Sequence, residues 1–201
     1  MKLILASASG TRRHMLEAAG LGFEVRPAAI DEDAVKARLR EEGLNALGLA
    51  LALAEAKAAA GSADADELVL GCDQTLERDD GSMIDKPRSP EEAAAQLRSL
   101  AGRPHRLHSA AAIVEHDAGH GTIVWREVET VTLFVRPLSE DFLAWYLDRE
   151  YEAVRHNVGG YRIEGLGAHL FDRIDGSHFA ILGLPLLPLL AYLRGRGVVP
   201  R

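Results

Sequence analysis

The stretch Glu67-Leu68-Val69-Leu70-Gly71-Cys72-Asp73-Gln74 places three large apolar residues in succession and then a carboxylate. Unbroken apolar runs of this kind are typical of strands covered on both faces, which predicts a buried strand over residues 67–72. Ligands gather at the carboxyl ends of strands in open α/β sheets. Asp73 is therefore a candidate site residue, and the alternative is that it only caps the following turn.

Outward from this strand, towards the N-terminus, the chain reads Leu5-Ala6-Ser7-Ala8-Ser9-Gly10-Thr11-Arg12-Arg13. The pattern predicts a short strand over residues 2–6, a loop of small residues and the start of a helix. Free N–H groups at a helix start attract anions, whereas Arg12 and Arg13 set positive charge against the helix dipole. A bound phosphate would remove this conflict, and arginine suits phosphate geometry. Two solvated surface arginines are the alternative.

The remaining chain mixes strand and helix signals. After a first helix closed by Gly20, helices are predicted over residues 31–40, 44–60, 89–100, 139–150 and 186–194. Strands are predicted over residues 23–26, 106–115, 122–135, 169–174 and 179–182, with turns at 79–81 and 116–121. The intermixing indicates an α/β or α+β class with a mixed sheet, in one continuous domain over residues 1–201.

Composition narrows the classes of function. The net charge of −7 gives no global attraction for nucleic acid or for an anionic membrane, so a bound anion needs a local cluster of cations. The single cysteine, Cys72, allows no internal disulfide, which fits a reducing compartment. We find no signal peptide and no apolar run of the roughly 20 residues that a membrane span needs. The chain is therefore expected to be cytoplasmic and to bind neither nucleic acid nor membrane.

Several other residues have both a chemical and a structural interpretation. Lys86, held beside a proline, is either a phosphate ligand or a surface lysine. The acidic run at residues 30–33 suits helix capping, although a divalent cation would use the same carboxylates. His105 and His108 lie three apart near a predicted strand and so face opposite sides, which argues against a zinc pair. Cys72 is interpreted as a core residue.

Taken together, these motifs resemble the Maf family of nucleotide pyrophosphatases, and they keep the family's order along nearly the whole chain. Each motif is weak by itself, and the ordered set is specific. The motifs are residues 5–13, Ile30-Asp31-Glu32, Lys57-Ala58, Gly71-Cys72-Asp73-Gln74, Lys86-Pro87, the stretch from Leu97 to His105, residues 160–165 (Gly-Tyr-Arg-Ile-Glu-Gly) and Gly183-Leu184-Pro185-Leu186.

The resemblance implies an elongated mixed sheet flanked by helices, with two lobes and a central cleft. It implies hydrolysis between the α and β phosphates of a nucleoside triphosphate, with a divalent cation, Mg²⁺ or Mn²⁺, and a homodimer. Carried over by position, Asp73 is the proton acceptor, and Glu32 with Asp73 would hold the metal. An aspartate is a weak base at neutral pH, so Asp73 could act as base, as metal ligand or as both. The expected phosphate ligands are Ser7, Arg12, Arg13, Lys57 and Lys86.

The resemblance also addresses the nucleotide base. One branch of the family acts on dTTP and UTP and another on 7-methyl-GTP, and three positions distinguish them. This chain has Thr11, Gln74 and Glu164 there, and the last two match the 7-methyl-GTP branch. Thr11 cannot stack as that branch's aromatic residue would, and Gly10 replaces the family's proline. The alternatives are a dTTP/UTP pyrophosphatase and a nucleotide-binding regulator of cell division that does not need turnover.

Overall fold

The computed structural model describes residues 1–61, 66–117 and 120–200, and these form a mixed α/β fold, as predicted. In this part of the chain a seven-stranded sheet has the order β2-β1-β3-β5-β6-β7, with β4 paired to β3. The chain divides into two compact units. Unit 1 contains Met1–Gln74, Ser109–Glu129 and His178–Arg201, and unit 2 contains Thr75–His108 and Thr130–Ser177. Three long strands contribute residues to both: β3 (Glu67–Arg78), β5 (Pro104–Asp117) and β6 (His120–Val135).

The parallel part of the sheet lies in unit 1. The strand β1 (Lys2–Leu5) pairs in parallel with β2 (Phe23–Val25) on one side and with β3 on the other. Its register with β3 ends at the pair Leu5 and Leu70. Asp73 lies three residues after Leu70 and is therefore just past the point where β1 ends, while its own strand continues to Arg78. The expectation that β3 ends at Cys72 is wrong, and the strand end that marks the site belongs to β1.

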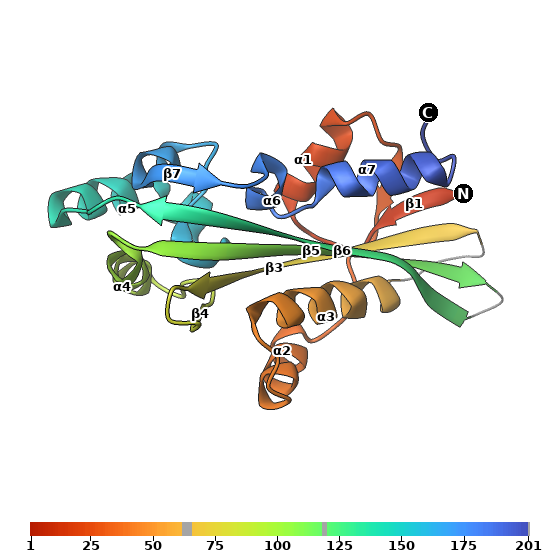
Figure 1. The fold of residues 1–201 in the computed structure, drawn as a ribbon, viewed down its shortest axis with the longest axis horizontal. Helices are drawn as coiled ribbons and strands as arrows, with labels where there is room; N and C mark the ends of the chain where they lie inside the picture. Colours follow the sequence, from red (N-terminus) through yellow and green to blue (C-terminus); the bar gives the residue numbers. More distant parts are fainter. Residues whose placement is uncertain (62–65, 118–119, 201) are drawn as a thin grey trace. The chain divides into compact units, whose positions relative to one another are not determined.

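Helices cover both faces of the sheet in unit 1. Figure 1 shows α1 (Gly10–Ala18) and α7 (Leu186–Gly195) on one face, and α2 (Glu32–Glu41) and α3 (Ala46–Ala59) on the other. Leu68 and Leu70 pack with α1 and α7, whereas Val69 points to the opposite face. This double coverage explains why the apolar run of β3 does not alternate with polar residues.

Unit 2 contains the other parts of the three long strands, together with two short strands and the helices described next. The strands β4 (Met83–Ile84) and β7 (Phe171–Asp175) pair antiparallel with β3 and β6, respectively. The helices α4 (Pro90–Leu100) and α5 (Glu140–Val154) pack against each other. Two short 3₁₀ helices, η1 (Val158–Gly160) and η2 (Leu166–Leu170), follow α5. They flank the segment in which the sequence analysis placed Glu164.

Local signals located the helix starts well. Each of five helices begins after a side chain that accepts a hydrogen bond from the first turn, which satisfies a backbone N–H group that has no partner within the helix. These N-cap residues are Ser9, Asp31, Asn45, Ser89 and Ser139.

The late apolar segments follow the prediction less closely. Residues 179–182 were predicted as a strand, but the chain forms the short helix α6 (His178–Ile181). Four apolar residues do not distinguish a buried strand from a buried helix, and packing decides between them. The strand expected over 169–174 begins two residues later, after η2. The turn expected at 116–121 includes residues 118 and 119, which lie outside the described residues.

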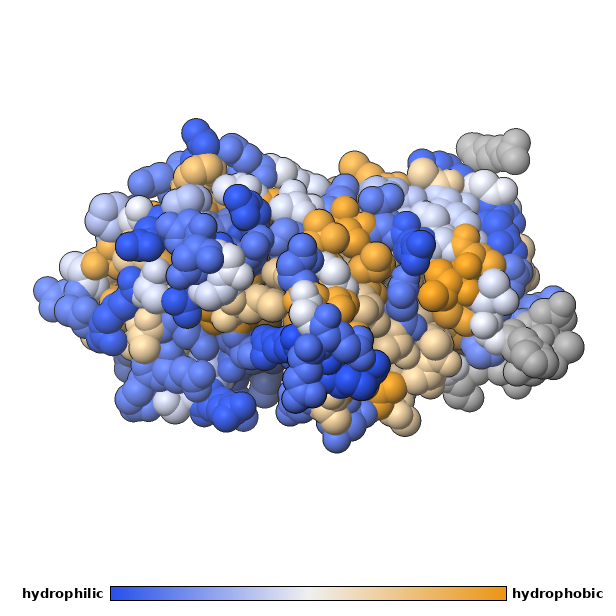
Figure 2. Space-filling model, turned by 60° about the horizontal axis from the view of Figure 1, so that its bottom comes forward, coloured by the Kyte–Doolittle hydropathy of each residue, from blue (hydrophilic) through white to orange (hydrophobic). Residues whose placement is uncertain are grey.

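The described helices include none with the length and apolar character of a membrane span. Figure 2 shows one face of the molecule, where hydrophobic residues occur in patches between hydrophilic ones. Leu47 of α3 and Leu187 of α7 are among the large apolar side chains exposed to solvent.

Candidate active site

Three charged side chains of unit 1 meet at one point, and we call them the Asp73 cluster. The Lys57 Nζ atom donates to Asp73 Oδ1 at 2.7 Å and forms an ion pair with Glu32 Oε2 at 2.8 Å. Asp73 is 6% exposed and Lys57 is 9% exposed. Charges buried to this degree require a partner, and here two carboxylates share one ammonium group.

A glycine allows α3 to approach the strand that carries Asp73. A Cβ atom at Gly71 would lie 2.2 Å from the Ala54 carbonyl oxygen and 2.4 Å from the Ala58 nitrogen, so only glycine fits. Gly71 and Asp73 are two residues apart on a strand and therefore face the same side of the sheet. The helix that rests on Gly71 thus sets Lys57 beside Asp73. From the sequence, Gly71 is known only as part of a motif, and this role in packing is not evident there.

The acidic run at the start of α2 supplies a helix cap and one member of the Asp73 cluster. Asp31 caps the helix, because its Oδ1 atom accepts from the Ala34 nitrogen at 3.0 Å. Glu32, the next residue, pairs with Lys57 instead. The first turn of α2 is thereby stabilised by one carboxylate and contributes another to the Asp73 cluster.

Arg12 reaches the backbone next to Asp73. Its Nε atom donates to the Gly183 carbonyl at 2.8 Å, and its Nη1 atom donates to the Cys72 carbonyl at 3.1 Å and to Ser7 Oγ at 3.3 Å. Arg12 is thus fixed in place, and Ser7 lies within its reach. Arg13 is different, since its side chain is 60% exposed and pairs only loosely with Glu17, at 3.4 Å. Arg12 is therefore held by the protein, whereas Arg13 is exposed, and its role as a phosphate ligand stays a prediction.

The amide of Gln74 is held by the protein. Its Nε2 atom donates to Ser109 Oγ at 2.8 Å, to the Ala180 carbonyl at 3.0 Å and to the Ile181 carbonyl at 3.1 Å. Ser109 donates in turn to the Ala180 carbonyl at 2.6 Å. Ser109 is not among the residues predicted from the sequence, since nothing in the local pattern links it to a residue 35 positions away. Thr11, the other specificity candidate of unit 1, is half-buried in the first turn of α1.

Two predicted site residues, Lys86 and Glu164, belong to unit 2. Both are exposed. Pro87, which follows Lys86, lies 3.9 Å from the position that a Cβ atom would take at Gly160. Their approach to the Asp73 cluster, like the cleft between two lobes, stays a prediction.

The histidines and the cysteine have structural surroundings. The Nε2 atom of His105 shares a 2.6 Å hydrogen bond with the Tyr161 hydroxyl. The ring of His108 contacts Thr130 at 2.9 Å and Glu77 at 3.0 Å. Each histidine thus has its own protein partners. Cys72 lies in the core of unit 1, and burial raises the pKa of its thiol to about 11, which confirms its interpretation as a core residue.

The Asp73 cluster suits a divalent cation. Over the described ranges, no three His, Cys, Asp or Glu side chains are grouped as a ready-made metal site. Glu32 and Asp73 nevertheless already converge on one cation, the Lys57 ammonium. Magnesium is usually held by one or two carboxylates together with substrate phosphates and water, so these two residues fit that ion.

Comparison with known proteins gives matches along nearly the whole chain. Residues 2–196 match the family model described as Maf-like protein. A nucleoside triphosphate pyrophosphatase of Sphingopyxis alaskensis is 48% identical over 202 residues, covering 100% of both chains. A 7-methyl-GTP pyrophosphatase of Rhizobium meliloti is 48% identical over 202 residues, covering 98% of this chain and 97% of the relative. A nucleoside triphosphate pyrophosphatase of Granulibacter bethesdensis is 49% identical over 195 residues, covering 96% of each chain.

Proposed function

The chain belongs to the Maf family, and we propose that it hydrolyses a nucleoside triphosphate between its α and β phosphates, which releases a nucleoside monophosphate and pyrophosphate. Relatives of nearly equal length carry names for this activity. The observation that carries the proposal is the Asp73 cluster, in which a buried aspartate is held by a lysine next to a fixed arginine. Binding alone does not require a buried carboxylate of this kind.

In the proposed reaction Asp73 takes the proton of the attacking water. The water oxygen bonds to one of the two phosphorus atoms that share the bridging oxygen, the bond from that phosphorus to the bridge breaks, and the leaving group departs with the bridging oxygen. Lys57 holds the Asp73 carboxylate in one orientation. Because a carboxylate is a weak base, this geometry needs a water that is already acidified. A divalent cation held by Glu32 and Asp73 would supply that acidity.

Positive groups stabilise the negative charge that spreads over the phosphates in the transition state. Arg12 is oriented in advance by two backbone carbonyls, so its guanidinium loses little freedom when substrate binds. Arginine also forms paired hydrogen bonds with phosphate oxygens. We assign the phosphates to Ser7, Arg12, Arg13 and Lys57 of unit 1 and to Lys86 of unit 2.

For the base we propose 7-methyl-GTP or a related modified purine nucleotide. The two hydrogens of the Gln74 amide nitrogen are engaged by Ser109 and α6, so the amide oxygen is the group that Gln74 can offer a ligand. Glu164 is also an acceptor. Two acceptors match the donor-bearing edge of guanine, and a carboxylate also balances the charge of a methylated ring. Thr11 would approach the base without stacking on it.

The decisive experiment supplies 7-methyl-GTP, GTP, dTTP and UTP with Mg²⁺ or Mn²⁺ and measures pyrophosphate and inorganic phosphate separately. We expect pyrophosphate, with 7-methyl-GTP preferred. Preference for dTTP and UTP would assign the chain to the other branch, and release of inorganic phosphate would refute the proposed bond cleavage. Tight binding without any product would favour the regulator instead. A homodimer and a cytoplasmic location stay predictions, and sedimentation and fractionation test them.

A further inference from the structure

The segment of residues 157–167 in unit 2 carries Glu164 and is fixed by its own backbone; we call it the Glu164 segment. Gly159 and Gly160 have φ angles of 78° and 66°, in the left-handed region that glycine adopts most easily. A Cβ atom at Gly159 would also lie 2.6 Å from Leu76 Cδ1. A Cβ atom at Gly167 would lie 2.3 Å from the Arg162 carbonyl oxygen. The segment therefore folds back on itself in a way that other residues would obstruct.

Buried hydrogen bonds hold the start of this segment. The Tyr146 hydroxyl donates to the Gly160 carbonyl at 3.2 Å, and Asn157 Nδ2 donates to the Tyr161 carbonyl at 3.1 Å. The Tyr161 hydroxyl meets His105 at 2.6 Å. Burial lowers the pKa of His105 to about 4 and keeps the pKa of Tyr161 well above its usual value of 10.0. Both groups are therefore neutral near pH 7, and their hydrogen bond does not depend on titration there.

The next residue, Arg162, is clamped by a carboxylate of α5. Its Nε atom donates to Glu150 Oε2 at 2.7 Å, and its Nη2 atom donates to Glu150 Oε1 at 3.2 Å. This two-bond geometry fixes the plane of the guanidinium as well as its distance. Glu150 is only 5% exposed, so its charge depends on this partner. The hydrogen bonds that Arg162 donates to Glu150 raise the pKa of Arg162, and the charge of Glu164 raises it further.

We propose that Arg162, clamped by Glu150, is a positioning residue that fixes the backbone of the Glu164 segment and so places Glu164 for recognition of the nucleotide base. This inference rests on the proposed function, in which Glu164 contacts the base. A glutamate on a loose segment would lose conformational freedom on binding, whereas one attached to a clamped segment has lost it already. The buried partner of Arg162 thereby acts on selectivity without touching the substrate.

The test compares Glu150→Gln with a matched control on the same helix. Glu140 of α5 also binds an arginine through two bonds, at 2.8 and 2.7 Å, and this arginine, Arg98, belongs to α4 and not to the Glu164 segment. For each variant we would measure kcat and KM with 7-methyl-GTP and with UTP. We expect Glu150→Gln to lower the ratio of kcat/KM for 7-methyl-GTP to kcat/KM for UTP by about tenfold or more, because kcat/KM for 7-methyl-GTP falls. Glu140→Gln should leave that ratio within about twofold, as is usual for exposed pairs.

A second variant keeps the inference testable if the loss of a buried carboxylate unfolds unit 2. Arg162→Lys keeps the charge but loses the paired hydrogen bonds, and it should shift the same ratio in the same direction. Thermal unfolding monitored by circular dichroism identifies variants that are folded. An unchanged ratio in folded Glu150→Gln and Arg162→Lys would overturn the inference, as would an equal shift in Glu140→Gln. Wild-type protein that releases no pyrophosphate from any nucleotide would refute the proposed function itself and this inference with it.

Discussion

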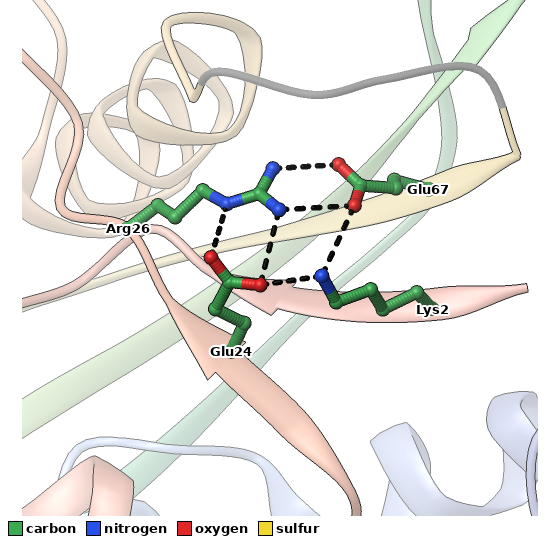
Figure 3. A network of polar contacts seen from close by, with 4 residues as sticks. All are labelled: Lys2, Glu24, Arg26 and Glu67. Atoms are coloured by element: carbon green, nitrogen blue, oxygen red, sulfur yellow. Dashed lines mark hydrogen bonds and ion pairs between the residues drawn. The ribbon is translucent and has the colours of Figure 1, made fainter.

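Two clusters of charged side chains each include one residue of β3, and their charges are arranged differently. Near the start of the strand, Glu67 belongs to a network with Lys2, Glu24 and Arg26, the Arg26 network, which Figure 3 shows. Arg26 binds Glu24 and Glu67 through two bonds each, with shortest distances of 2.7 Å, and Lys2 contacts both carboxylates. Two cations therefore meet two anions, and every member contacts two opposite charges.

The Asp73 cluster, six residues further along β3, has a different balance. Its two carboxylates both pair with the ammonium group of Lys57. It is also more deeply placed, because Lys57 and Asp73 are almost fully buried whereas half of the Lys2 side chain is exposed. A second cation, Arg12, binds the backbone beside Asp73 and not its carboxylate.

The difference separates a stabilising arrangement from a reactive one. In the Arg26 network the charges satisfy one another, so it has little to gain from a ligand and contributes to stability. In the Asp73 cluster two carboxylates converge on one buried ammonium group, and under the proposed function these carboxylates also accept a metal ion or the proton of a water. Similar substitutions in the two clusters are therefore predicted to have different effects. Removing the charge of Asp73 should reduce turnover, and removing the charge of Glu67 should reduce stability.

The largest expected effect is the loss of turnover in Asp73→Asn. The amide has nearly the same shape as the carboxylate but cannot take a proton from water. We expect kcat to fall by about 10²- to 10⁴-fold, the usual contribution of a general base. Pyrophosphate release measures the loss, and circular dichroism checks that the variant is folded. Glu67→Gln, the same kind of change in the Arg26 network, serves as control and should keep kcat. Near-normal turnover of Asp73→Asn would remove Asp73 from the mechanism.

The next effect concerns the stability that Lys57 gives to its two partners. Lys57→Met keeps most of the side-chain volume and removes the shared cation, so Glu32 and Asp73 face each other without it. We expect a loss of about 3 kcal/mol in the free energy of unfolding, as for other buried pairs that lose one partner. Urea unfolding measures this loss with and without Mg²⁺. Because a divalent cation can replace the ammonium, Mg²⁺ should stabilise Lys57→Met more than it stabilises Asp73→Asn. Equal responses would contradict metal binding by this pair of carboxylates.

Much of the fold could be predicted because its signals are local. The apolar run of β3 and the N-cap residues depend only on neighbours in sequence, and the start of β3 and the start of α4 lie where they were expected. The segment 179–182 was misassigned because four apolar residues carry no usable period. Its helix is stabilised by contacts from elsewhere, including the bonds that Gln74 makes to the carbonyls of Ala180 and Ile181.

The site was less predictable than the fold. Sequence patterns named Asp73 and Lys57, but the bridge from Lys57 to Glu32 depends on how α2 and α3 pack. Arg12 binds a carbonyl 171 residues away, at Gly183. No local pattern contains such a contact. Residue types and motif order therefore indicate which chemistry is present, and long-range packing determines which groups are left to perform it.

A smaller effect is expected from Glu67→Gln on stability. Glu67 is 5% exposed and accepts two hydrogen bonds from Arg26, at 2.7 and 3.1 Å. An amide can accept only one of these, and it removes the negative charge opposite Arg26 and Lys2. We expect the free energy of unfolding to fall by about 2 kcal/mol, in the range for hydrogen bonds to charged groups. Urea unfolding tests this at pH 7. A stability equal to that of the wild type would show that the Arg26 network contributes little.

The smallest effect concerns Glu24, the exposed carboxylate of the same network. Hydrogen bonds from Arg26 and then from Lys2 lower the pKa of Glu24 from 4.5 to about 2. Between these two values the unfolded chain binds the proton and the folded chain does not, so folding stability rises with pH in this window. The stabilisation is present above pH 4.5 and is lost as the pH falls towards 2.

Glu24→Gln should therefore be less stable than the wild type at pH 6, and the difference should shrink as the pH falls from 4.5 to 2. Urea midpoints measured at several pH values follow this difference. Glu41→Gln, at an exposed glutamate of α2, controls for the loss of one negative charge. A difference between Glu24→Gln and the wild type that does not change with pH would mean that Glu24 is not held by its two cations. Of the two carboxylates in the Arg26 network, only Glu67 would then be held by both cations.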